Sequence, residues 1–487
     1  MKKALMVLGG ALIALTVVLI ARTATYHSRQ VPVEPAPALA LDSGAAAERL
    51  AGALRFATVS FGGSVGVDTM PFHGLQSYLE HAFPRAHASL TRERVGGLAL
   101  LYRWAGSDTT LQPILLLAHQ DVVPVEPGTE SRWTEPPFAG RIAGGYVWGR
   151  GALDDKGNLV AVLEAVETLL EQGYRPRRTV YLGFGADEEV GGRRGAAQIA
   201  ALLATRGVRP AFAVDEGGAI VRGLVPDAGR AVALVGIGEK GYLSVELTVH
   251  VAGGHSSMPP AETAVGMLSA AIDRLEHRPM PAAIRGPTAK MLDYLGPEMP
   301  FGTRLVLANR WLFGGPIAAR LGATPAGNAM LRTTTAPTIF QAGVKDNVLP
   351  SAARAVVNFR LLPGDSSGLV LAHVRETVHD PRVEARALGE TVSEASPVSD
   401  VASPNFALLE RTIRQAAPDA IVVPWLVVGA TDSRYYARLT GDVYRFSAAR
   451  LGPGDLARVH GTDERIGVGD YAANVKFYVL LIKNAAT

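Results

Sequence analysis

The alternation of apolar and polar positions divides this chain into segments of different character. An uncharged apolar run from Ala4 to Ala21 follows Lys2 and Lys3 and stops at Arg22. This run is near the lower length limit of a membrane-spanning helix and longer than the apolar core of most cleaved signal peptides. No small-x-small cleavage site follows it directly. We therefore predict that residues 1–22 are an N-terminal membrane anchor or signal, with the uncleaved anchor favoured.

After the apolar run the pattern becomes extended and then alternates between helical and strand-like periods. Residues 23–44 contain the Pro- and Ala-rich stretch VPVEPAPALAL and predict an extended linker. From residue 45, apolar runs that suit strands buried on both faces alternate with segments of helical period. This alternation predicts an α/β fold. The expected strands are 97–104, 113–118, 179–185 and 211–214, and the expected helices are 45–56, 75–81, 159–170 and 196–205.

The pattern changes again near residue 241, where polar and apolar residues begin to alternate as in a half-buried antiparallel strand. Strands at 242–251, 354–361 and 383–387 and helices at 264–275 and 367–379 approximate a β-α-β-β-α-β set. We predict an inserted α+β, ferredoxin-like domain in residues 241–389. The α/β domain would then comprise residues 45–240 and 390–487, the second part with a helix at 406–415, a strand at 420–428 and a final helix at 471–483.

Composition narrows the kind of partner and the kind of chemistry. The chain has 487 residues, which is too long for one compact core. Its formal net charge is only +3 and no basic run is present, so nothing indicates nucleic acid and a small-molecule partner is expected. The chain has no cysteine, so any bound metal must use histidine and carboxylate ligands.

Histidine and carboxylate residues follow successive predicted strands, at what would be the C-terminal edge of one sheet, where sites collect in open α/β folds. A bridging carboxylate with one histidine and one further carboxylate for each ion is the set that a pair of zinc ions needs. Each residue also has a structural explanation. Asp154 or Asp155 can cap the helix after WGRGALDDKGN, and the adjacent acids can be first-turn charges. The candidates are His119, Asp121, Asp154, Glu188, Glu189, Asp215 and His460.

Five motifs in a fixed order carry a resemblance to a known family. They are LLLAHQDVVPV, WGRGALDDKG, GADEEVGG, AVDEGG and VHGTDER. The chain resembles the co-catalytic zinc amidohydrolases and exopeptidases related to aminoacylase and bacterial glutamate carboxypeptidase. The apolar N-terminus and the enlarged insert are most similar to the carboxypeptidase S branch, which includes the N-fatty-acyl-amino-acid hydrolases. The fold implied is a zinc-exopeptidase-type mixed sheet flanked by helices, with an inserted lid and dimerisation domain.

The resemblance also assigns roles to residues. Asp154 would bridge two zinc ions, with His119 and Asp215 completing one site and Glu189 and His460 the other. Glu188 would be the general base and Asp121 the carboxylate that orients His119. The lid would supply His255 as an oxyanion donor, often to the partner subunit of a homodimer. Asn347 and Arg360 would bind the substrate carboxylate, and GATDSR would form part of the substrate loop.

The function expected is zinc-dependent hydrolysis of an amide bond next to a free amino-acid carboxylate, with water activated at the metal and Glu188 as base. N-acyl amino acids and short peptides remain as alternative substrates. The insert could line an acyl pocket or could simply pack within itself, through Phe301, Leu305, Leu307, Trp311, Leu312 and Phe313. A non-catalytic binding protein on the same scaffold is the alternative of a different class. The protein is expected to be exported, anchored facing the periplasm or exterior, or secreted if the segment is cleaved.

Overall fold

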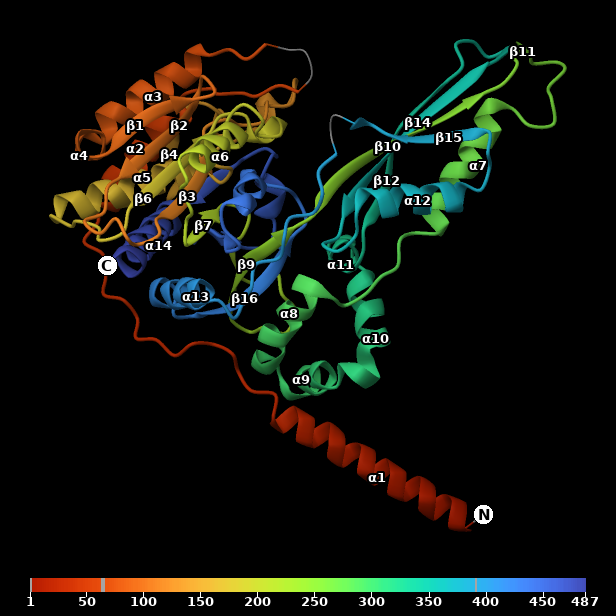
Figure 1. Ribbon diagram of the computed structural model, residues 1–487, viewed down its shortest axis with the longest axis horizontal. Coiled ribbons are helices and arrows are strands. Elements are labelled where there is room, and N and C mark those ends of the chain that lie inside the picture. The colour runs from red at the N-terminus through yellow and green to blue at the C-terminus, as the bar shows by residue number, and fades with distance from the viewer. Residues whose placement is uncertain (1, 63–65, 390–391) are drawn as a thin grey trace.

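The computed structural model describes residues 2–62, 66–389 and 392–487 (Figure 1). A large mixed sheet and a smaller antiparallel sheet form two bodies, joined where β9 passes into β10 at Lys240. The large body carries the predicted α/β fold, a mixed sheet flanked by helices, which confirms the predicted fold class. The predicted boundary at residue 390 falls outside the described residues.

The large sheet has ten strands, and its centre is parallel. Strand β3 (Ile114–His119) pairs in parallel with β6 (Val180–Gly185) and β7 (Phe212–Asp215), so their carboxyl ends meet at one edge. The order is β1-β2-β6-β3-β7-β17-β9-β8-β18, and β16 pairs with β9. The remaining strands are β1 (Thr91–Val95), β2 (Ala99–Trp104), β8 (Ile220–Val221), β9 (Ala231–Glu239), β16 (Ala420–Val427), β17 (Val443–Arg445) and β18 (Arg450–Leu451). A separate short sheet contains β4 (Arg141–Ala143), β5 (Tyr146–Trp148) and β19 (Arg465–Gly467).

Alternating side chains of β3 supply two separate cores, because successive residues of a strand point to opposite faces. Leu116 packs in the cluster that contains the helices α2, α5 and α14, whereas Leu115 and Leu117 pack with α6 on the other face. Both faces of the central strands are therefore covered, which explains their continuous apolar sequence. The helices of the large body are α2 (Ser43–Leu54), α3 (Met70–Ala82), α4 (Pro84–Ser89), α5 (Lys156–Glu171), α6 (Ala196–Thr205), α13 (Pro404–Ala416) and α14 (Val468–Ala486).

The smaller body is a four-stranded antiparallel sheet with two helices in its core. Its strands lie in the order β12-β14-β10-β15, and the chain runs β10-α7-β12-β14-α12-β15, which is the ferredoxin-like connection. The sequence pattern misses β12 because most of its side chains are exposed, so it shows no clear alternation. The elements are β10 (Gly241–His250), β12 (Thr334–Ala342), β14 (Ala352–Leu361), β15 (Val383–Ala387), α7 (Ala264–His277) and α12 (Ser367–Val378).

Four helices between α7 and β12 pack mainly on the large sheet. Met291, Leu295 and Ile317 belong to the same apolar cluster as Val423 of β16. The buried Lys240 amine donates to the carbonyls of Ala329 and Arg332, each at 2.9 Å, and fixes the end of this helical segment. The helices are α8 (Gly286–Leu295), α9 (Phe301–Ala308), α10 (Arg310–Gly322) and α11 (Pro325–Leu331).

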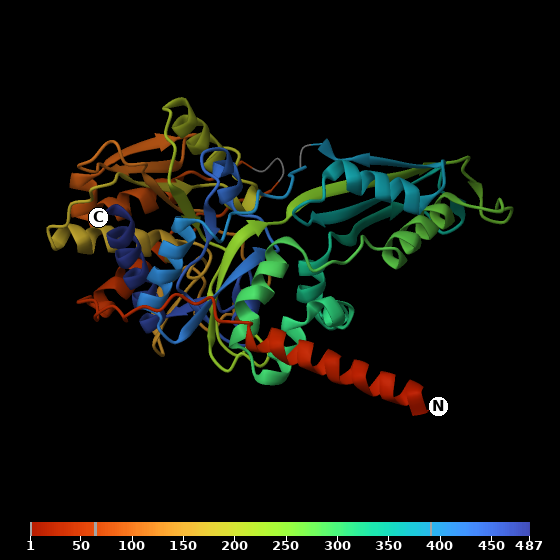
Figure 2. The same ribbon diagram turned by 60° about the horizontal axis from the view of Figure 1, so that its bottom comes forward.

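The N-terminal apolar run forms one helix, α1 (Lys2–Ala24), which projects from the body and touches α9 (Figures 1 and 2). It is long and apolar enough to cross a membrane, and its most apolar window is not buried. The predicted linker is extended, but it is also hydrogen bonded along the body. The Gln30 side chain exchanges two hydrogen bonds with the backbone of Val422, at 2.8 and 2.7 Å. We call residues 26–36 the strap.

Candidate metal centre and active site

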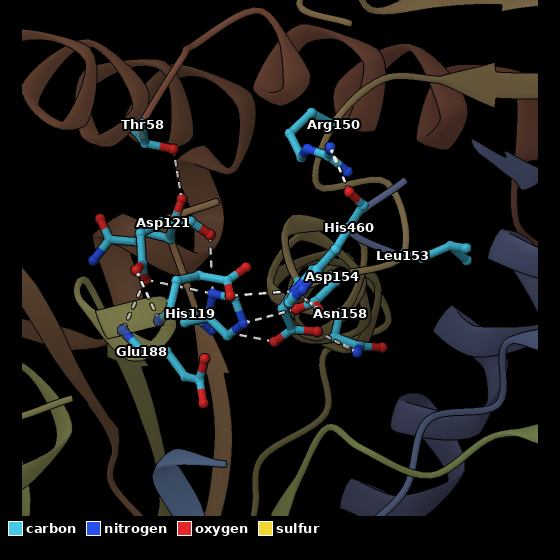
Figure 3. A network of polar contacts seen from close by, with 12 residues as sticks. Thr58, His119, Asp121, Arg150, Leu153, Asp154, Asn158, Glu188 and His460 are labelled. Carbon is cyan, nitrogen blue, oxygen red and sulfur yellow. Dashed lines mark hydrogen bonds and ion pairs between the residues drawn. The ribbon is translucent and has the colours of Figure 1, made fainter. Parts of the chain in front are cut away.

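Asp154 lies between two histidines that come from distant parts of the chain. His119, the last residue of β3, places Nε2 3.0 Å from Asp154 Oδ1 (Figure 3). His460, in the loop before β19, places Nε2 3.0 Å from Asp154 Oδ2. The two carboxylate oxygens therefore each face a different imidazole, which is the arrangement needed of a carboxylate shared by two cations.

The two adjacent glutamates form a short 3-10 turn, Glu188–Val190, directly after β6. Glu189 Oε2 lies 3.2 Å from His460 Nε2. His119, Asp154 and Glu189 each place one ligand atom within 4.8 Å of the others, as a metal site requires.

Asp121 contacts both His119 and the glutamate turn. Its carboxylate accepts the backbone N–H groups of Glu188 and Glu189, at 3.1 and 3.2 Å. Its backbone carbonyl lies 3.0 Å from His119 Nδ1, whereas its carboxylate is 3.4 Å from the same atom. Asp121 therefore orients His119 mainly through its carbonyl, and its carboxylate positions the glutamate turn.

Asp215 ends β7, beside β3, and its side chain is buried in the same cleft. Among the described residues, Asp215 Oδ2 and Glu189 Oε1 are buried without a hydrogen-bond partner. Buried carboxylate oxygens without donors are costly unless a cation neutralises them. The donor set of two imidazoles and three carboxylates thus fits divalent metal, and nitrogen and oxygen ligands suit zinc.

The charges of the cleft perturb one another. Burial raises the pKa of Glu188 well above its usual range, and the Asp432 and Glu189 carboxylates raise it further. Burial also raises the pKa of Asp215, to about 6. Burial acts in the same direction on Asp154, but its contacts with the two histidines hold its pKa below the ordinary value. Contacts with Asp154 and Glu189 raise the pKa of His460 to about 10. The cleft therefore favours positive charge between these carboxylates.

A buried ion pair joins the two loops that carry Asp154 and His460. Arg150 Nη1 lies 2.7 Å from Glu464 Oε2, and both side chains are buried. The other Glu464 oxygen accepts the N–H groups of Leu153 and Asp154, at 2.8 and 3.1 Å. Arg150 also donates to the carbonyl of His460 at 3.1 Å. This pair positions both residues, although the sequence singled out neither of its members.

Three further carboxylates lie at the site: Asp155, which the sequence offered as a cap of α5, and Glu216 and Asp432, for which the sequence predicted no role. Asp155 occupies the N-cap of α5 without a side-chain capping bond, and its carboxylate instead accepts the N–H of His119 at 3.2 Å. Glu216 lines a cavity together with Asp154. Asp432, from GATDSR, is buried with both oxygens unpartnered among the described residues. Their places in the quoted motifs were the available signal, but the motifs do not say which carboxylate points inward.

The predicted substrate residues divide into two groups. Arg360 stacks over Tyr242, with its guanidinium carbon 4.7 Å from the ring centroid. Burial lowers the pKa of Arg360, and the charge of Arg434 lowers it further. Burial also acts to lower the pKa of Arg434, but nearby groups, Glu188 among them, raise it above its ordinary value. Arg360 comes from β14 of the smaller sheet, whereas Arg434 comes from the 3-10 segment Asp432–Arg438 after β16 and donates to the carbonyl of Gly191 at 2.9 Å.

His255 and Asn347 do not join this cluster within one chain. His255 lies on β11 (Gly254–His255), which pairs with β13 (Val348–Leu349) at the distal end of the smaller body (Figure 1). Asn347 is exposed beside it, and its carbonyl accepts the N–H of Ser256 at 3.2 Å.

The sheet edge and its imidazole–carboxylate cluster define a metal-dependent hydrolase. The chain belongs to peptidase family M20/M25/M40, whose sequence profile matches residues 115–484. It is 41% identical over 483 residues to "Probable carboxypeptidase S-like 2" of Dictyostelium discoideum, covering 97% of this chain and 92% of that protein. It is 42% identical over 444 residues to "N-fatty-acyl-amino acid synthase/hydrolase PM20D1" of Xenopus tropicalis, covering 90% and 86%.

A solved structure has the same fold. The M20 family metallo-carboxypeptidase Sso-CP2 from Sulfolobus solfataricus matches with a TM-score of 0.65 and 19% identity, over 90% of this chain and 98% of that one. Membership of this family and the named relatives confirm the prediction of an amide hydrolase. The alternative of a non-catalytic binding protein is therefore dropped.

Replacing Glu464 by Gln should lower the free energy of unfolding by about 3 kcal/mol or more, because the substitution leaves the Arg150 charge buried and unpaired. Urea unfolding of the full chain in detergent, with a metal chelator present, measures this loss. Glu93→Gln is the control, since its pair with Arg206 is 42% and 43% exposed. The control substitution should lower the free energy of unfolding by less than about 1 kcal/mol. Equal losses would contradict the stabilising role of the buried pair.

Proposed function

We propose that this protein hydrolyses the amide bond of N-acyl amino acids that carry an apolar acyl group, using two zinc ions. The observation that carries this choice of substrate is an apolar cavity that begins at the metal centre. The cavity has a volume of about 530 Å³ and includes Asp154 and Glu216 in its wall. Most of its remaining lining is apolar, with Val221, Leu234 and Trp425 among the contributing side chains. An aliphatic chain suits such a wall better than a charged peptide does.

Two zinc ions would be held by the residues that face Asp154. His119 and Asp215 would complete one site, and Glu189 and His460 the other, with Asp154 shared. When bound, zinc acts as a Lewis acid that polarises the amide carbonyl and makes water a stronger acid. The relative named N-fatty-acyl-amino acid synthase/hydrolase supports this assignment of reaction class.

Glu188 has the position and environment of a general base. Burial raises the pKa of its carboxyl, which brings this pKa closer to those of the groups with which it exchanges protons. It would take a proton from the attacking water as the oxygen adds to the carbonyl carbon. It would then give that proton to the amide nitrogen as the carbon–nitrogen bond breaks. The Asp121 carboxylate keeps Glu188 in place through the backbone N–H.

Arg360 and Arg434 would bind the free carboxylate of the amino acid. A guanidinium recognises a carboxylate through two parallel hydrogen bonds. Arg360 would approach from β14 of the smaller sheet and Arg434 from the large body. Asn347 and His255 would reach the site from the partner subunit of a homodimer, because their own chain holds them at its distal end (Figure 1). The exposed edge strand β12 offers a surface for such pairing, with Ile339 42% and Phe340 45% exposed.

Helix α1 would anchor the protein in the membrane, with the catalytic body on the exterior or periplasmic side. Lys2 and Lys3 precede the apolar run and would remain on the cytoplasmic side. Cleavage of this segment would produce a secreted form instead.

Replacing Glu188 by Gln should lower kcat by about 10²- to 10⁴-fold, because the base is lost while the metal ligands remain. Turnover of an N-acyl amino acid and metal content by elemental analysis are measured together. The neighbouring Glu189→Gln is the matched control, and it should reduce metal content because Glu189 is a proposed ligand. Normal turnover by the zinc-loaded Glu188→Gln protein would contradict the assigned role.

Replacing Val225 by Trp should restrict the acyl group. Val225 lies in the wall shared with a second cavity, so a larger side chain blocks the way beyond it. We expect kcat/KM for an N-palmitoyl amino acid to fall about tenfold or more, because several methylene groups are excluded from the apolar site. The kcat/KM for the N-acetyl substrate should not change. Ala318→Trp, in a different cavity of the same insert, is the control.

A preference of the wild-type enzyme for blocked dipeptides over long-chain N-acyl amino acids would favour the carboxypeptidase alternative. Equal loss of both N-acyl substrates in Val225→Trp would instead indicate a damaged fold, and Ala318→Trp shows how much damage one added indole causes.

Mixing two inactive variants, Glu188→Gln and His255→Ala, should restore activity. If His255 acts across a dimer, each mixed dimer has one site with both residues intact. Random exchange of subunits then recovers about a quarter of the wild-type sites. The activity of co-expressed chains, compared with each variant alone, measures this. No recovery in dimers verified as mixed would mean that His255 does not act across the interface.

A further inference from the structure

Exposed apolar side chains lie on α9, which α1 contacts, and on the adjoining α10. Phe301 of α9 is 57% exposed, and Trp311 and Leu312 of α10 are 56% and 42% exposed. Large apolar side chains exposed on adjoining helices are typical of surfaces that bind a partner or a membrane. We call these three residues the apolar face.

The apolar face is held at a fixed place relative to α1. The Asn309 side chain, between α9 and α10, donates to the carbonyl of Leu19 at 3.1 Å. Tyr26, at the start of the strap, donates from its hydroxyl to the carbonyl of Leu292 at 2.6 Å. The Gln30 contacts with Val422 then continue this attachment to the large sheet. In a membrane that contains α1, the same side of the body would therefore always face the lipid.

A second apolar cavity lies behind the apolar face. It has a volume of about 500 Å³, and Gly302, Thr303 and Val306 of α9 line it. Helix α9 therefore contacts both this cavity and α1. The second cavity shares part of its wall with the cavity at the metal centre, through Leu224, Val225, Leu234, Met330 and Trp425. These side chains therefore separate two apolar cavities, one at Asp154 and one at α9.

The charges around the apolar face suit an anionic lipid surface. The end of α1 and the strap carry Arg22 and Arg29, and the acidic residue of the strap, Glu34, follows them. The helical segment 286–322 has twice as many basic as acidic residues. Basic residues beside an apolar face favour membranes that contain anionic lipid. The basic residues are Lys290, Arg304, Arg310 and Arg320, and the acidic ones are Asp293 and Glu298.

We propose that α9 and α10 rest on the lipid bilayer, and that acyl chains pass between the bilayer and the two cavities through this helical segment. The inference rests on the proposed N-acyl amino acid substrate for its second half, the passage of acyl chains. The contact with the bilayer itself depends only on α1, the strap and the apolar face. A substrate that partitions into lipid could then reach the metal centre without its tail crossing water.

Fluorescence quenching tests the bilayer contact without using catalysis. The full chain is placed in vesicles of phosphatidylcholine and phosphatidylglycerol, with or without bromine in the acyl chains. Trp311 is exposed, whereas Trp104, Trp133 and Trp148 are buried. The emission that Trp311→Phe removes should be mostly quenched by the brominated lipids. If that emission is unquenched in vesicles that contain the protein, α10 is in water and the proposal is wrong.

Turnover tests the passage of acyl chains. The double variant Phe301→Ser, Trp311→Ser should hydrolyse vesicle-borne N-palmitoyl amino acid about tenfold more slowly, the scale of two lost apolar contacts. Its rate on a soluble N-acetyl substrate should be unchanged. Leu369→Ser, which alters a side chain that is 57% exposed on α12, should leave both rates unchanged. Equal rates for the double variant and wild type on the vesicle-borne substrate would overturn this half of the proposal.

These results separate the inference from the proposed function. If brominated lipids quench Trp311 but the double variant hydrolyses the vesicle-borne substrate as fast as wild type, the bilayer contact is supported and the passage of acyl chains is overturned. Chain-length selection by Val225→Trp without quenching supports the N-acyl substrate and overturns the contact.

Discussion

The concentration of carboxylates around Asp154 is the constraint on which this site depends. Asp121, Asp215, Glu188 and Glu189 come from three strand ends and meet in one cleft, and Glu216 and Asp432 add to them. Gathering like charges in a largely buried place is unfavourable without cations to offset it. The two histidine side chains alone can offset only part of the negative charge of these carboxylates. The fold therefore supplies a cleft in which divalent metal relieves an electrostatic cost that the protein itself creates.

Segments far apart in the sequence must meet for this cleft to exist. The pair Arg150 and Glu464 joins a turn before α5 to a loop near the C-terminus, across the whole smaller body that lies between them in the chain. Because Glu464 also accepts the N–H of Asp154, the pair sets the position of the central carboxylate and of the loop that carries His460. The smaller body fits between them in the chain because the segments that enter and leave it lie side by side, where Tyr242 and Ser393 exchange backbone hydrogen bonds of 2.7 and 2.8 Å.

The sequence predicted most of the fold because long apolar runs and helical periods are local signals. It predicted the strands before His119 and Asp215 and the helix after Asp155, and the order of motifs identified the family. It missed β12, whose side chains are exposed, and β9, whose pairing with β16 depends on residues nearly 190 positions later. It also missed Arg150 and Glu464, since a buried ion pair leaves no periodic signal. It could not reveal that the linker is bonded to the body, because Gln30 resembles any polar linker residue.

The strap also determines what a protease would release. Its contacts with the body begin at Tyr26, after the last residue of α1, and continue to Ala36, whose N–H donates to the carbonyl of Gln415 at 3.1 Å. A cut between Ala24 and Tyr26 would remove the apolar helix and leave every one of these hydrogen bonds intact. Removal of α1 at that point would therefore leave the new N-terminus hydrogen bonded to the large body.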